Sequence, residues 1–165
     1  MGSKSPLFKI ILIGQITVGK TSLLERMVTG ECDEKPKMMI GVNFKHQEIE
    51  QVGSRFKILY YDVGGNDHIT KYYPFIQEMS LLLFVFKVDS SSSLDFIQKV
   101  LDKVPLNNSP KILVGNKIDL VNQREISTET AEKFAVKHNM KYIETSAKDG
   151  SNINKLNTLI LDLLI

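Results

Sequence analysis

Residues 14–21 read Gly-Gln-Ile-Thr-Val-Gly-Lys-Thr, which matches the pattern G-x-x-x-x-G-K-[ST]. The pattern follows an apolar run and opens a helical stretch. In that setting it predicts a loop whose main-chain N–H groups surround a polyphosphate at the positive end of a helix. The ammonium group of Lys20 would reach the β- and γ-phosphates, and the hydroxyl of Thr21 would be a hard oxygen ligand for Mg²⁺. The alternative interpretation is a strand-to-helix turn that binds no ligand.

A second polar motif, Asn116-Lys117-Ile118-Asp119, follows the apolar residues Ile112–Gly115. The carboxylate of Asp119 could accept hydrogen bonds from both the ring N–H and the exocyclic amine of guanine, whereas adenine offers no such pair of donors. Leaving a buried carboxylate unpaired costs about 1–3 kcal/mol or more, which would discriminate between the two bases. The motif alone could also be a polar turn, but its place at the end of a later strand favours base recognition.

A third motif, Asp62-Val63-Gly64-Gly65, ends an expected strand. A carboxylate at such a strand end, opposite a phosphate loop, can hold Mg²⁺, often through water. Gly65 could donate its N–H to the terminal phosphate. Aspartate and glycine also build ordinary turns, so this motif is the least specific of the three.

Short β-rich runs alternate with helical stretches, a pattern typical of a parallel sheet covered by helices. Three apolar runs are expected to be buried parallel strands: Leu7–Ile13, Leu81–Val88 and Ile112–Gly115. Two further runs, Val42–Gln51 and Arg55–Asp62, flank Gly53–Ser54 and predict a hairpin that adds an antiparallel edge to the sheet.

Helical periodicity is present in three internal segments: Thr21–Val28, Ser93–Val104 and Thr128–His138. Ser127 is the expected N-cap of the third segment, and His138 is expected to cover the edge of its apolar face rather than to bind a ligand. A final helix places an apolar stripe between Ile153 and Leu164. That stripe suits core packing, although an exposed helix could also present it to a partner.

Composition limits the function classes. The chain has 165 residues, enough for one domain, and its net charge of +2 is too small to indicate nucleic-acid binding. The longest apolar run, Leu81–Phe86, is far shorter than the roughly 20 residues that span a membrane. The single cysteine, Cys32, favours a reducing compartment, and the three histidines do not have metal-ligand spacing.

Together with Glu144-Thr145-Ser146-Ala147-Lys148, the three motifs give the whole chain a resemblance to the small GTPases of the Ras superfamily. Residues Ile40–Phe44 and the pair Tyr72-Tyr73 are most similar to the Rab branch, whereas Asp62–Gly65 is similar to the Arf branch. The resemblance implies a single α/β domain of the P-loop NTPase type over residues 1–165. It also implies a mostly parallel six-stranded sheet with helices on both faces.

The resemblance also implies site roles. Mg²⁺ would be held by Thr21 and Asp62, and hydrolysis would depend on Lys20 and on Asn66, which stands where the family has the glutamine that orients water. The residues implied to bind GTP or GDP are Thr17, Val18, Gly19, Lys20, Thr21, Ser22, Gly65, Asn116, Lys117, Asp119, Ser146, Ala147 and Lys148. Two switch segments, about 32–41 and 64–79, would change order with the γ-phosphate.

The implied partners are effectors and regulators, namely an exchange factor and an activating protein. The expected location is the cytoplasm, with peripheral membrane association only if the chain continues to a lipidated C-terminus.

Four positions depart from the family pattern. Met39 replaces the switch threonine that ligates Mg²⁺, and a thioether is a poor Mg²⁺ ligand. Asn66 is one methylene shorter than glutamine, and Ile16 stands where a small residue faces the γ-phosphate, so we expect slow hydrolysis. Cys32 replaces an aromatic residue that lies against guanine, which predicts fast nucleotide release.

Two functions therefore compete. One is a nucleotide switch with weak GTP hydrolysis, related to the Rab proteins and acting in vesicle traffic or signalling. The other is a pseudo-GTPase, an interaction module that holds nucleotide without a productive cycle. A third possibility, an adenine-specific P-loop enzyme such as a kinase, is disfavoured by Asp119 and by the segment Ser146–Lys148.

Overall fold

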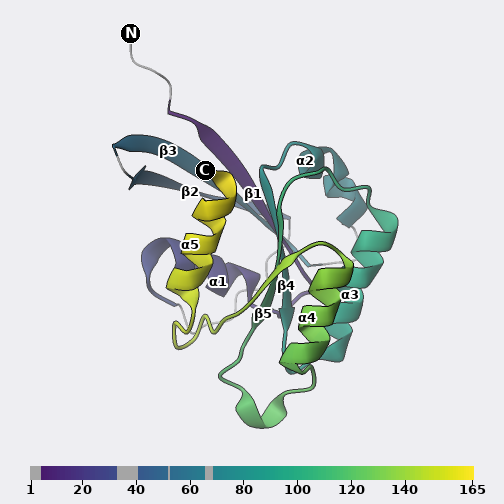
Figure 1. Cartoon of the computed structure of the whole chain (residues 1–165). Helices are drawn as coiled ribbons and strands as arrows, with labels where there is room; N and C mark the ends of the chain where they lie inside the picture. Colours follow the sequence, from purple (N-terminus) through teal and green to yellow (C-terminus); the bar gives the residue numbers. More distant parts are fainter. Residues whose placement is uncertain (1–4, 33–40, 52, 66–68) are drawn as a thin grey trace.

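The structure is a computed structural model that describes residues 5–32, 41–51, 53–65 and 69–165. Over these residues the chain forms six strands and five α-helices (Figure 1). The strands are β1 (Leu7–Ile13), β2 (Val42–Gln51), β3 (Ser54–Val63), β4 (Leu81–Lys87), β5 (Lys111–Asn116) and β6 (Lys141–Glu144). The helices are α1 (Lys20–Thr29), α2 (Tyr73–Gln77), α3 (Ser91–Lys103), α4 (Thr128–Lys137) and α5 (Ile153–Leu164), with 3-10 turns at Ile69–Tyr72 and Val121–Gln123.

The strands form one sheet in the order β2-β3-β1-β4-β5-β6. β1 pairs in parallel with both β3 and β4, the pairs β4–β5 and β5–β6 are also parallel, and β2 runs antiparallel to β3. The mostly parallel six-stranded sheet is therefore confirmed. Because parallel strands end at the same edge, the segments that follow β1, β3, β4, β5 and β6 meet there, at the bottom of Figure 1.

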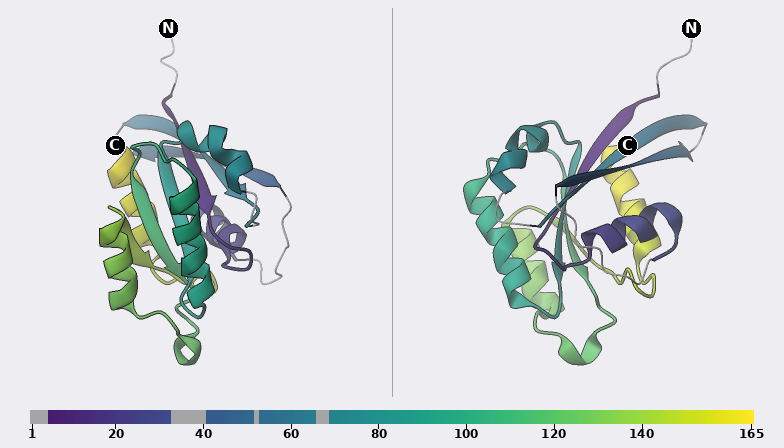
Figure 2. Two further views of the ribbon diagram at one scale, coloured as in Figure 1. Left: turned by 90° about the vertical axis from the view of Figure 1, so that its right-hand side faces the viewer. Right: turned by 180° about the vertical axis from the view of Figure 1, so that it is seen from behind.

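Helices cover both faces of the sheet, as predicted. Figures 1 and 2 show α1 and α5 on one face and α2, α3 and α4 on the other. Each face has its own apolar core, with side chains that alternate along the strands: Ile10 and Leu12 pack toward α1 and α5, and Ile11 and Ile13 pack toward the other three helices. Six of the seven residues of β4 are buried, as suits a central strand covered on both sides.

The hairpin, the helix cap and the histidine lie as expected. Gly53 has φ of 76°, a left-handed conformation that glycine adopts readily in the tight turn between β2 and β3. Ser127 Oγ accepts a hydrogen bond from Thr130 N at 3.1 Å and caps α4. The half-buried ring of His138 packs on Phe134, with centroids 4.6 Å apart, and its Nε2 lies 3.0 Å from Gln98 Oε1.

Several predicted boundaries are wrong by one or two residues. β5 extends one residue beyond the predicted run at each end, because Lys111 and Asn116 are polar but continue the ladder with β4. α3 begins at Ser91 rather than Ser93, since a serine run gives no apolar periodicity. Smaller shifts affect the ends of α1, α3, α4, β3 and β4. The short elements α2 and β6 were not located from the sequence, because four or five residues are too few to show a period.

The apolar stripe of α5 is mainly core. Ile153, Leu156 and Ile160 are buried, while Leu163 and Leu164 are partly buried beside them. Among the residues that the structure describes, every helix is too short or too polar to span a bilayer.

Candidate functional site

The loop between β1 and α1 has the backbone that its sequence predicts. Thr17 and Gly19 both have left-handed φ values, 68° and 91°. A Cβ on Gly14 would lie 2.2 Å from the carbonyl oxygen of Val85 in β4, and one on Gly19 would lie 2.7 Å from Asn116 Nδ2. Glycine is therefore required at both positions by close packing, and the loop is fixed against the ends of β4 and β5.

Lys20 lies at the start of α1, and its side chain turns back into the loop. Its Nζ donates to the carbonyl oxygens of Gly14 at 2.8 Å and Gln15 at 2.9 Å, and the residue is only 7% exposed. Burial lowers the pKa of Lys20 to about 8, although the nearby Asp62 carboxylate opposes that shift. An ammonium group held in this way would be stabilised by the anionic oxygens of a phosphate.

Thr21 and Asp62 come together beside Lys20. Thr21 Oγ1 donates to Asp62 Oδ2 at 2.6 Å, which joins the first turn of α1 to the end of β3. Burial raises the pKa of the Asp62 carboxyl above its usual value, while the hydrogen bond from Thr21 and the charge of Lys20 act in the opposite direction. The other oxygen, Oδ1, is buried and has no hydrogen-bond partner among the described residues.

An unpartnered carboxylate oxygen beside a threonine hydroxyl fits a Mg²⁺ ion or its coordinated water, because Mg²⁺ prefers hard oxygen ligands. Among the described residues, no three His, Cys, Asp or Glu side chains lie close enough together to hold a metal ion by themselves.

Gly65 closes the same region from the end of β3. A Cβ on Gly65 would lie 2.4 Å from three main-chain atoms of Gly14, Gln15 and Ile16. Ile16 N also donates to Gly65 O at 3.0 Å. The residue after the Asp62 strand therefore lies directly against the phosphate loop, and any side chain there would displace it.

The motif after β5 contacts the same loop from the other side. Asn116 is buried, and its Nδ2 donates to Val18 O at 3.0 Å. Lys117 has a left-handed φ of 67°, and its Nζ donates to Thr17 O at 2.7 Å. A non-glycine residue in this conformation is uncommon, and such residues cluster at functional sites.

The segment after β6 packs on the Asn116 motif. Asn116 Oδ1 accepts from Thr145 Oγ1 and from Ala147 N, both at 3.2 Å. Ser146 Oγ donates to Asp119 Oδ1 at 2.7 Å. Four segments that lie far apart in the sequence thus form one continuous polar site.

A family model described as the Ras family matches residues 9–164. The chain belongs to the Ras family. Its relatives include the Ras-related protein Rab-30 of Homo sapiens, 35% identical over 156 residues that cover 91% of this chain and 76% of that protein. The Ras-related protein Rab-1 of Theileria parva is 35% identical over 163 residues, covering 96% and 74% of the two chains. Rab-33A of Mus musculus is 34% identical over 163 residues, covering 95% and 69%. The predicted closeness to the Rab branch is therefore confirmed.

The positions at which this Ras-family chain departs from the family pattern are only partly described. Met39 and Asn66 lie outside the described residues. Ile16 lies on the phosphate loop and is 50% exposed, so its branched side chain projects from the loop. Cys32 is half-buried and packs against the core on the face of the sheet that α1 and α5 cover.

Two charged residues that support the site, Arg26 and Arg124, were not recognised from the sequence. Arg26 on α1 donates to Ala147 O and Lys148 O, at 2.8 and 2.6 Å. Arg124 forms an ion pair with Glu144, which also accepts hydrogen bonds from Tyr142 and Thr128. Glu144 lies just before residues Ser146–Lys148, which we call the base loop. No local pattern marks these side chains, because their partners are distant in sequence or belong to other elements.

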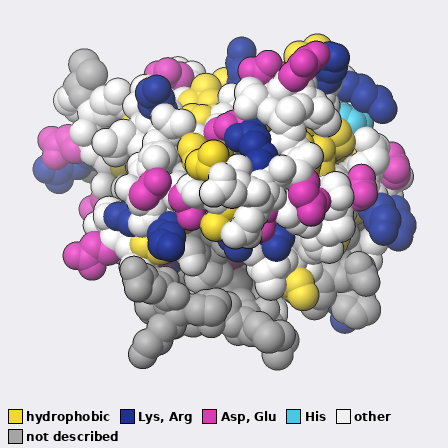
Figure 3. All heavy atoms as spheres, turned by 90° about the horizontal axis from the view of Figure 1, so that it is seen from below, with side chains coloured by type: hydrophobic (Ala, Val, Ile, Leu, Met, Phe, Trp, Pro, Cys, Tyr) yellow, Lys and Arg dark blue, Asp and Glu magenta, His cyan; other side chains and the backbone are white. Residues whose placement is uncertain are grey.

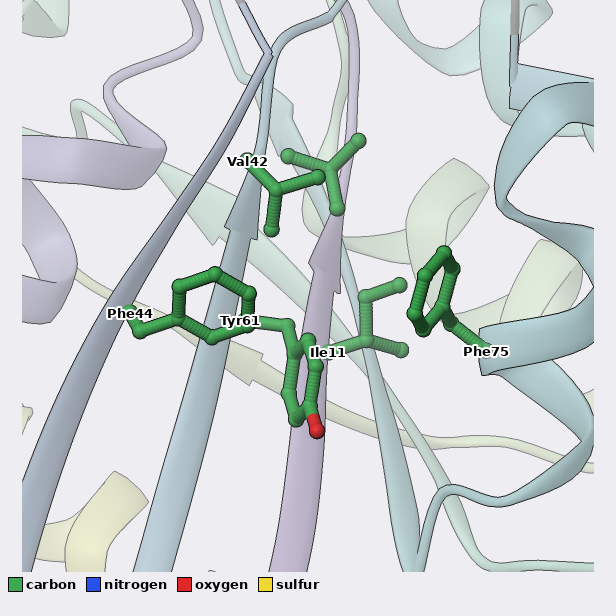
Figure 4. A pocket seen from close by; sticks show the side chains of 6 residues that line it. Ile11, Val42, Phe44, Tyr61 and Phe75 are labelled. Carbon is green, nitrogen blue, oxygen red and sulfur yellow. The ribbon is translucent and has the colours of Figure 1, made fainter.

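An aromatic patch lies beside the phosphate end of the site, between β2, β3 and α2 (Figure 4). Phe44 and Phe75 are 54% and 47% exposed. The ring of Tyr61 lies between them, with its centroid 4.9 Å from that of Phe44 and 6.4 Å from that of Phe75. Figure 3 shows the edge at which the parallel strands end, where basic and acidic side chains are interspersed over the visible face.

Proposed function

We propose that this chain binds GTP and GDP with Mg²⁺ and acts as a molecular switch whose hydrolysis of GTP is slow. The observation that carries this proposal is the direct bonding between the two ends of the site. Lys117 and Asn116 of the base motif donate to carbonyl oxygens of the phosphate loop at 2.7 and 3.0 Å. Such bonding would hold a nucleotide's base and phosphates at a fixed separation.

The phosphate end would work through the main chain and one charge. The N–H groups from Thr17 to Ser22 and Gly65, together with Lys20, would bind the phosphates. Thr21 and Asp62 would hold Mg²⁺, which when bound offsets the negative charge of the phosphates.

The base end would confer specificity. Asp119 would accept both N–H donors of guanine, with its carboxylate already oriented by Ser146 Oγ at 2.7 Å. The main chain of Ala147 and Lys148 would close over the base beside Asn116. The test is affinity for GDP, IDP and ADP, since IDP lacks the exocyclic amine. We expect GDP to bind about tenfold or more tighter than IDP in the wild type, and Asp119→Ala to remove that difference.

We expect slow hydrolysis because three residues depart from the family pattern. Ile16 would crowd the attacking water and any arginine supplied by an activating protein, Asn66 would hold that water less well than glutamine, and Met39 would remove a hard Mg²⁺ ligand. A single-turnover GTP assay should therefore give a rate below that of ordinary small GTPases. The triple variant I16G/M39T/N66Q should raise it; hydrolysis at the ordinary rate in the wild type would contradict the proposal.

Fast nucleotide release follows from Cys32. An aromatic ring against guanine contributes about 0.5–1.5 kcal/mol beyond area burial, which cysteine does not supply. Cys32→Phe should slow the release of a fluorescent GDP analogue by about twofold to tenfold. Very slow release from the wild type would contradict this expectation.

A pseudo-GTPase module is the second candidate, favoured by the same substitutions. The two functions differ in whether the aromatic patch of Phe44, Tyr61 and Phe75 responds to the γ-phosphate. For a switch we assign effectors and regulators to this patch, because exposed aromatic clusters are typical of protein interfaces. Its amide hydrogen exchange should then differ between the GDP form and a form loaded with a non-hydrolysable GTP analogue. Identical exchange, equal affinities and no turnover would identify the module. For the switch, we further propose a role in vesicle traffic or signalling.

A further inference from the structure

The side chain of Arg26, on α1, joins the C-terminal end of that helix to the base loop. Its Nε donates to Ala147 O at 2.8 Å, one terminal nitrogen donates to Lys148 O at 2.6 Å, and the other donates to Gly30 O at 2.9 Å. Ala147 and Lys148 belong to the base loop, and Gly30 is the left-handed C-cap of α1. The guanidinium therefore satisfies carbonyl groups in two segments more than 110 residues apart.

Other hydrogen bonds also hold the base loop, both to Asn116 and Asp119, as described above, and within its own turn. Gly150 N donates to Ser146 O at 2.9 Å and Ser146 N to Ser151 O at 3.2 Å, which closes a tight turn. Asn152 Nδ2 donates to Glu144 O at 2.9 Å and fixes the start of the same segment. These bonds determine the shape of the turn and its place beside the Asn116 motif, whereas Arg26 bonds the turn directly to α1.

The helix that carries Arg26 begins in the phosphate loop. Lys20 and Thr21 are its first residues, and Arg26 lies six residues later, about 9 Å along the axis at 1.5 Å per residue. One rigid element thus connects the phosphate end of the site to the loop that would cover the base. The planar fork of arginine suits this role, because it presents several donors in fixed directions, whereas lysine presents a single charged nitrogen.

We propose that Arg26 is a positioning residue that holds the loop Ser146–Lys148 closed over the base and so sets the residence time of guanine nucleotide. The inference rests on the proposed binding of guanine nucleotide. Release requires the loop to lift from the base, and lifting it breaks the bonds of Arg26 to Ala147 O and Lys148 O. Because Cys32 supplies no aromatic ring on the neighbouring side of the base, the contacts of this loop contribute a larger part of the interactions that retain the bound nucleotide.

The test is the dissociation rate of a fluorescent GDP analogue from the full chain. Arg26→Gln should raise this rate by about tenfold to a hundredfold. The association rate should stay within about twofold of the wild type, because the variant weakens the contact of the loop with bound nucleotide but does not obstruct its entry. Arg26→Lys should give an intermediate rate. Arg55→Gln is the matched control, because Arg55 is exposed on β3, where it pairs with Glu50 at 3.4 Å; it should leave the rate unchanged.

Removal of Mg²⁺ distinguishes positioning from general weakening. Contacts with the base act independently of the contacts with the phosphates. The ratio of the dissociation rates of Arg26→Gln and the wild type should therefore be the same with Mg²⁺ and with EDTA. An unchanged dissociation rate, or a factor that disappears in EDTA, would overturn the proposal. Should Arg26→Gln fail to fold, a wild-type rate in Arg26→Lys would overturn it equally. Failure of the wild type to bind GDP would instead refute the proposed function.

Discussion

Thr21 Oγ1 and Asp62 Oδ2 lie 2.6 Å apart, although 41 residues separate them in the sequence. The bond joins the helix that follows the phosphate loop to the strand that carries the acidic motif. It orients the carboxylate so that Asp62 Oδ1 remains buried and unpartnered among the described residues. Two oxygen groups from different elements are thus held side by side where we propose that Mg²⁺ binds.

Replacement of Asp62 should uncouple nucleotide release from Mg²⁺. In the wild type we expect Mg²⁺ to slow GDP release by about tenfold or more, because an ion held by Thr21 and Asp62 would offset the negative charge of the phosphates. In Asp62→Ala the rates with Mg²⁺ and with EDTA should agree within about twofold. Asp162→Ala, which removes an exposed carboxylate on α5, is the control. A persisting effect of Mg²⁺ on GDP release in Asp62→Ala would show that Asp62 does not help to hold Mg²⁺.

GDP affinity should fall as the pH rises above about 8. Burial lowers the pKa of Lys20 to about 8, and bound phosphate would raise it again, so binding above that pH takes up a proton. The dissociation constant should increase by up to tenfold per pH unit between pH 8 and 9 and change little between pH 7 and 7.5. Calorimetry in buffers of different ionisation enthalpy measures both effects. Lys20→Met should bind GDP more weakly and lose this pH dependence. A GDP affinity of the wild type that does not change with pH would contradict the linkage between Lys20 protonation and binding.

Glu144 should stabilise the fold at neutral pH and lose that effect in acid. Burial alone would raise its pKa, but hydrogen bonds from Arg124, Thr128 and Tyr142 lower it below the usual value. The stabilisation is therefore complete above about pH 4.5 and is lost as the pH falls through the lowered pKa. Glu144→Gln should reduce the free energy of unfolding by about 1–3 kcal/mol at pH 7, and the difference from the wild type should shrink toward pH 3.

Urea unfolding at the two pH values measures the effect of Glu144. The control is Glu129→Gln, because Glu129 is exposed on α4 and its pairing with Lys133 lies on the surface. It should change stability by no more than about 0.5 kcal/mol. A wild-type advantage over Glu144→Gln that is the same at pH 3 and pH 7 would show that the carboxylate charge is not the cause.

Asn107 should stabilise the chain through the end of α2. Its Nδ2 donates to the carbonyl oxygens of Ile76 and Gln77, both at 3.2 Å, and of Met79 at 2.9 Å. Asn107→Ala leaves these groups without that donor and should lower the free energy of unfolding by about 1–3 kcal/mol. The neighbouring exposed Asn108, replaced by alanine, should have an effect below about 0.5 kcal/mol. Equal effects of the two variants in urea unfolding would contradict this assignment.

The fold and the motif residues could be predicted because their signals are local. The buried strand β1 and the hairpin turn at Gly53 follow from the order of side chains within about ten residues. The same holds for the phosphate loop, where glycine spacing and a following lysine define the backbone. That Asn116 and Lys117 contact this loop follows from topology, since β1 and β5 end at one edge of the sheet.

The supporting residues could not be predicted, since their partners are set only by packing. Arg26 is an ordinary charged residue of an amphipathic helix until α1 meets the base loop, 121 residues away. Asn107 resembles any polar loop residue, although it caps the end of α2 from the loop between α3 and β5. The expectations for Met39 and Asn66 stay predictions, because both lie outside the described residues.

Calorimetric titration of nucleotide-free protein with GDP in the presence of Mg²⁺ tests the central claim most directly. We predict one GDP bound per chain, at least about a hundredfold more tightly than ADP, and loss of most of that affinity in Lys20→Met. Wild-type protein that gives no binding heat at several temperatures, and that releases no guanine nucleotide on acid extraction as purified, would contradict the assignment of this site.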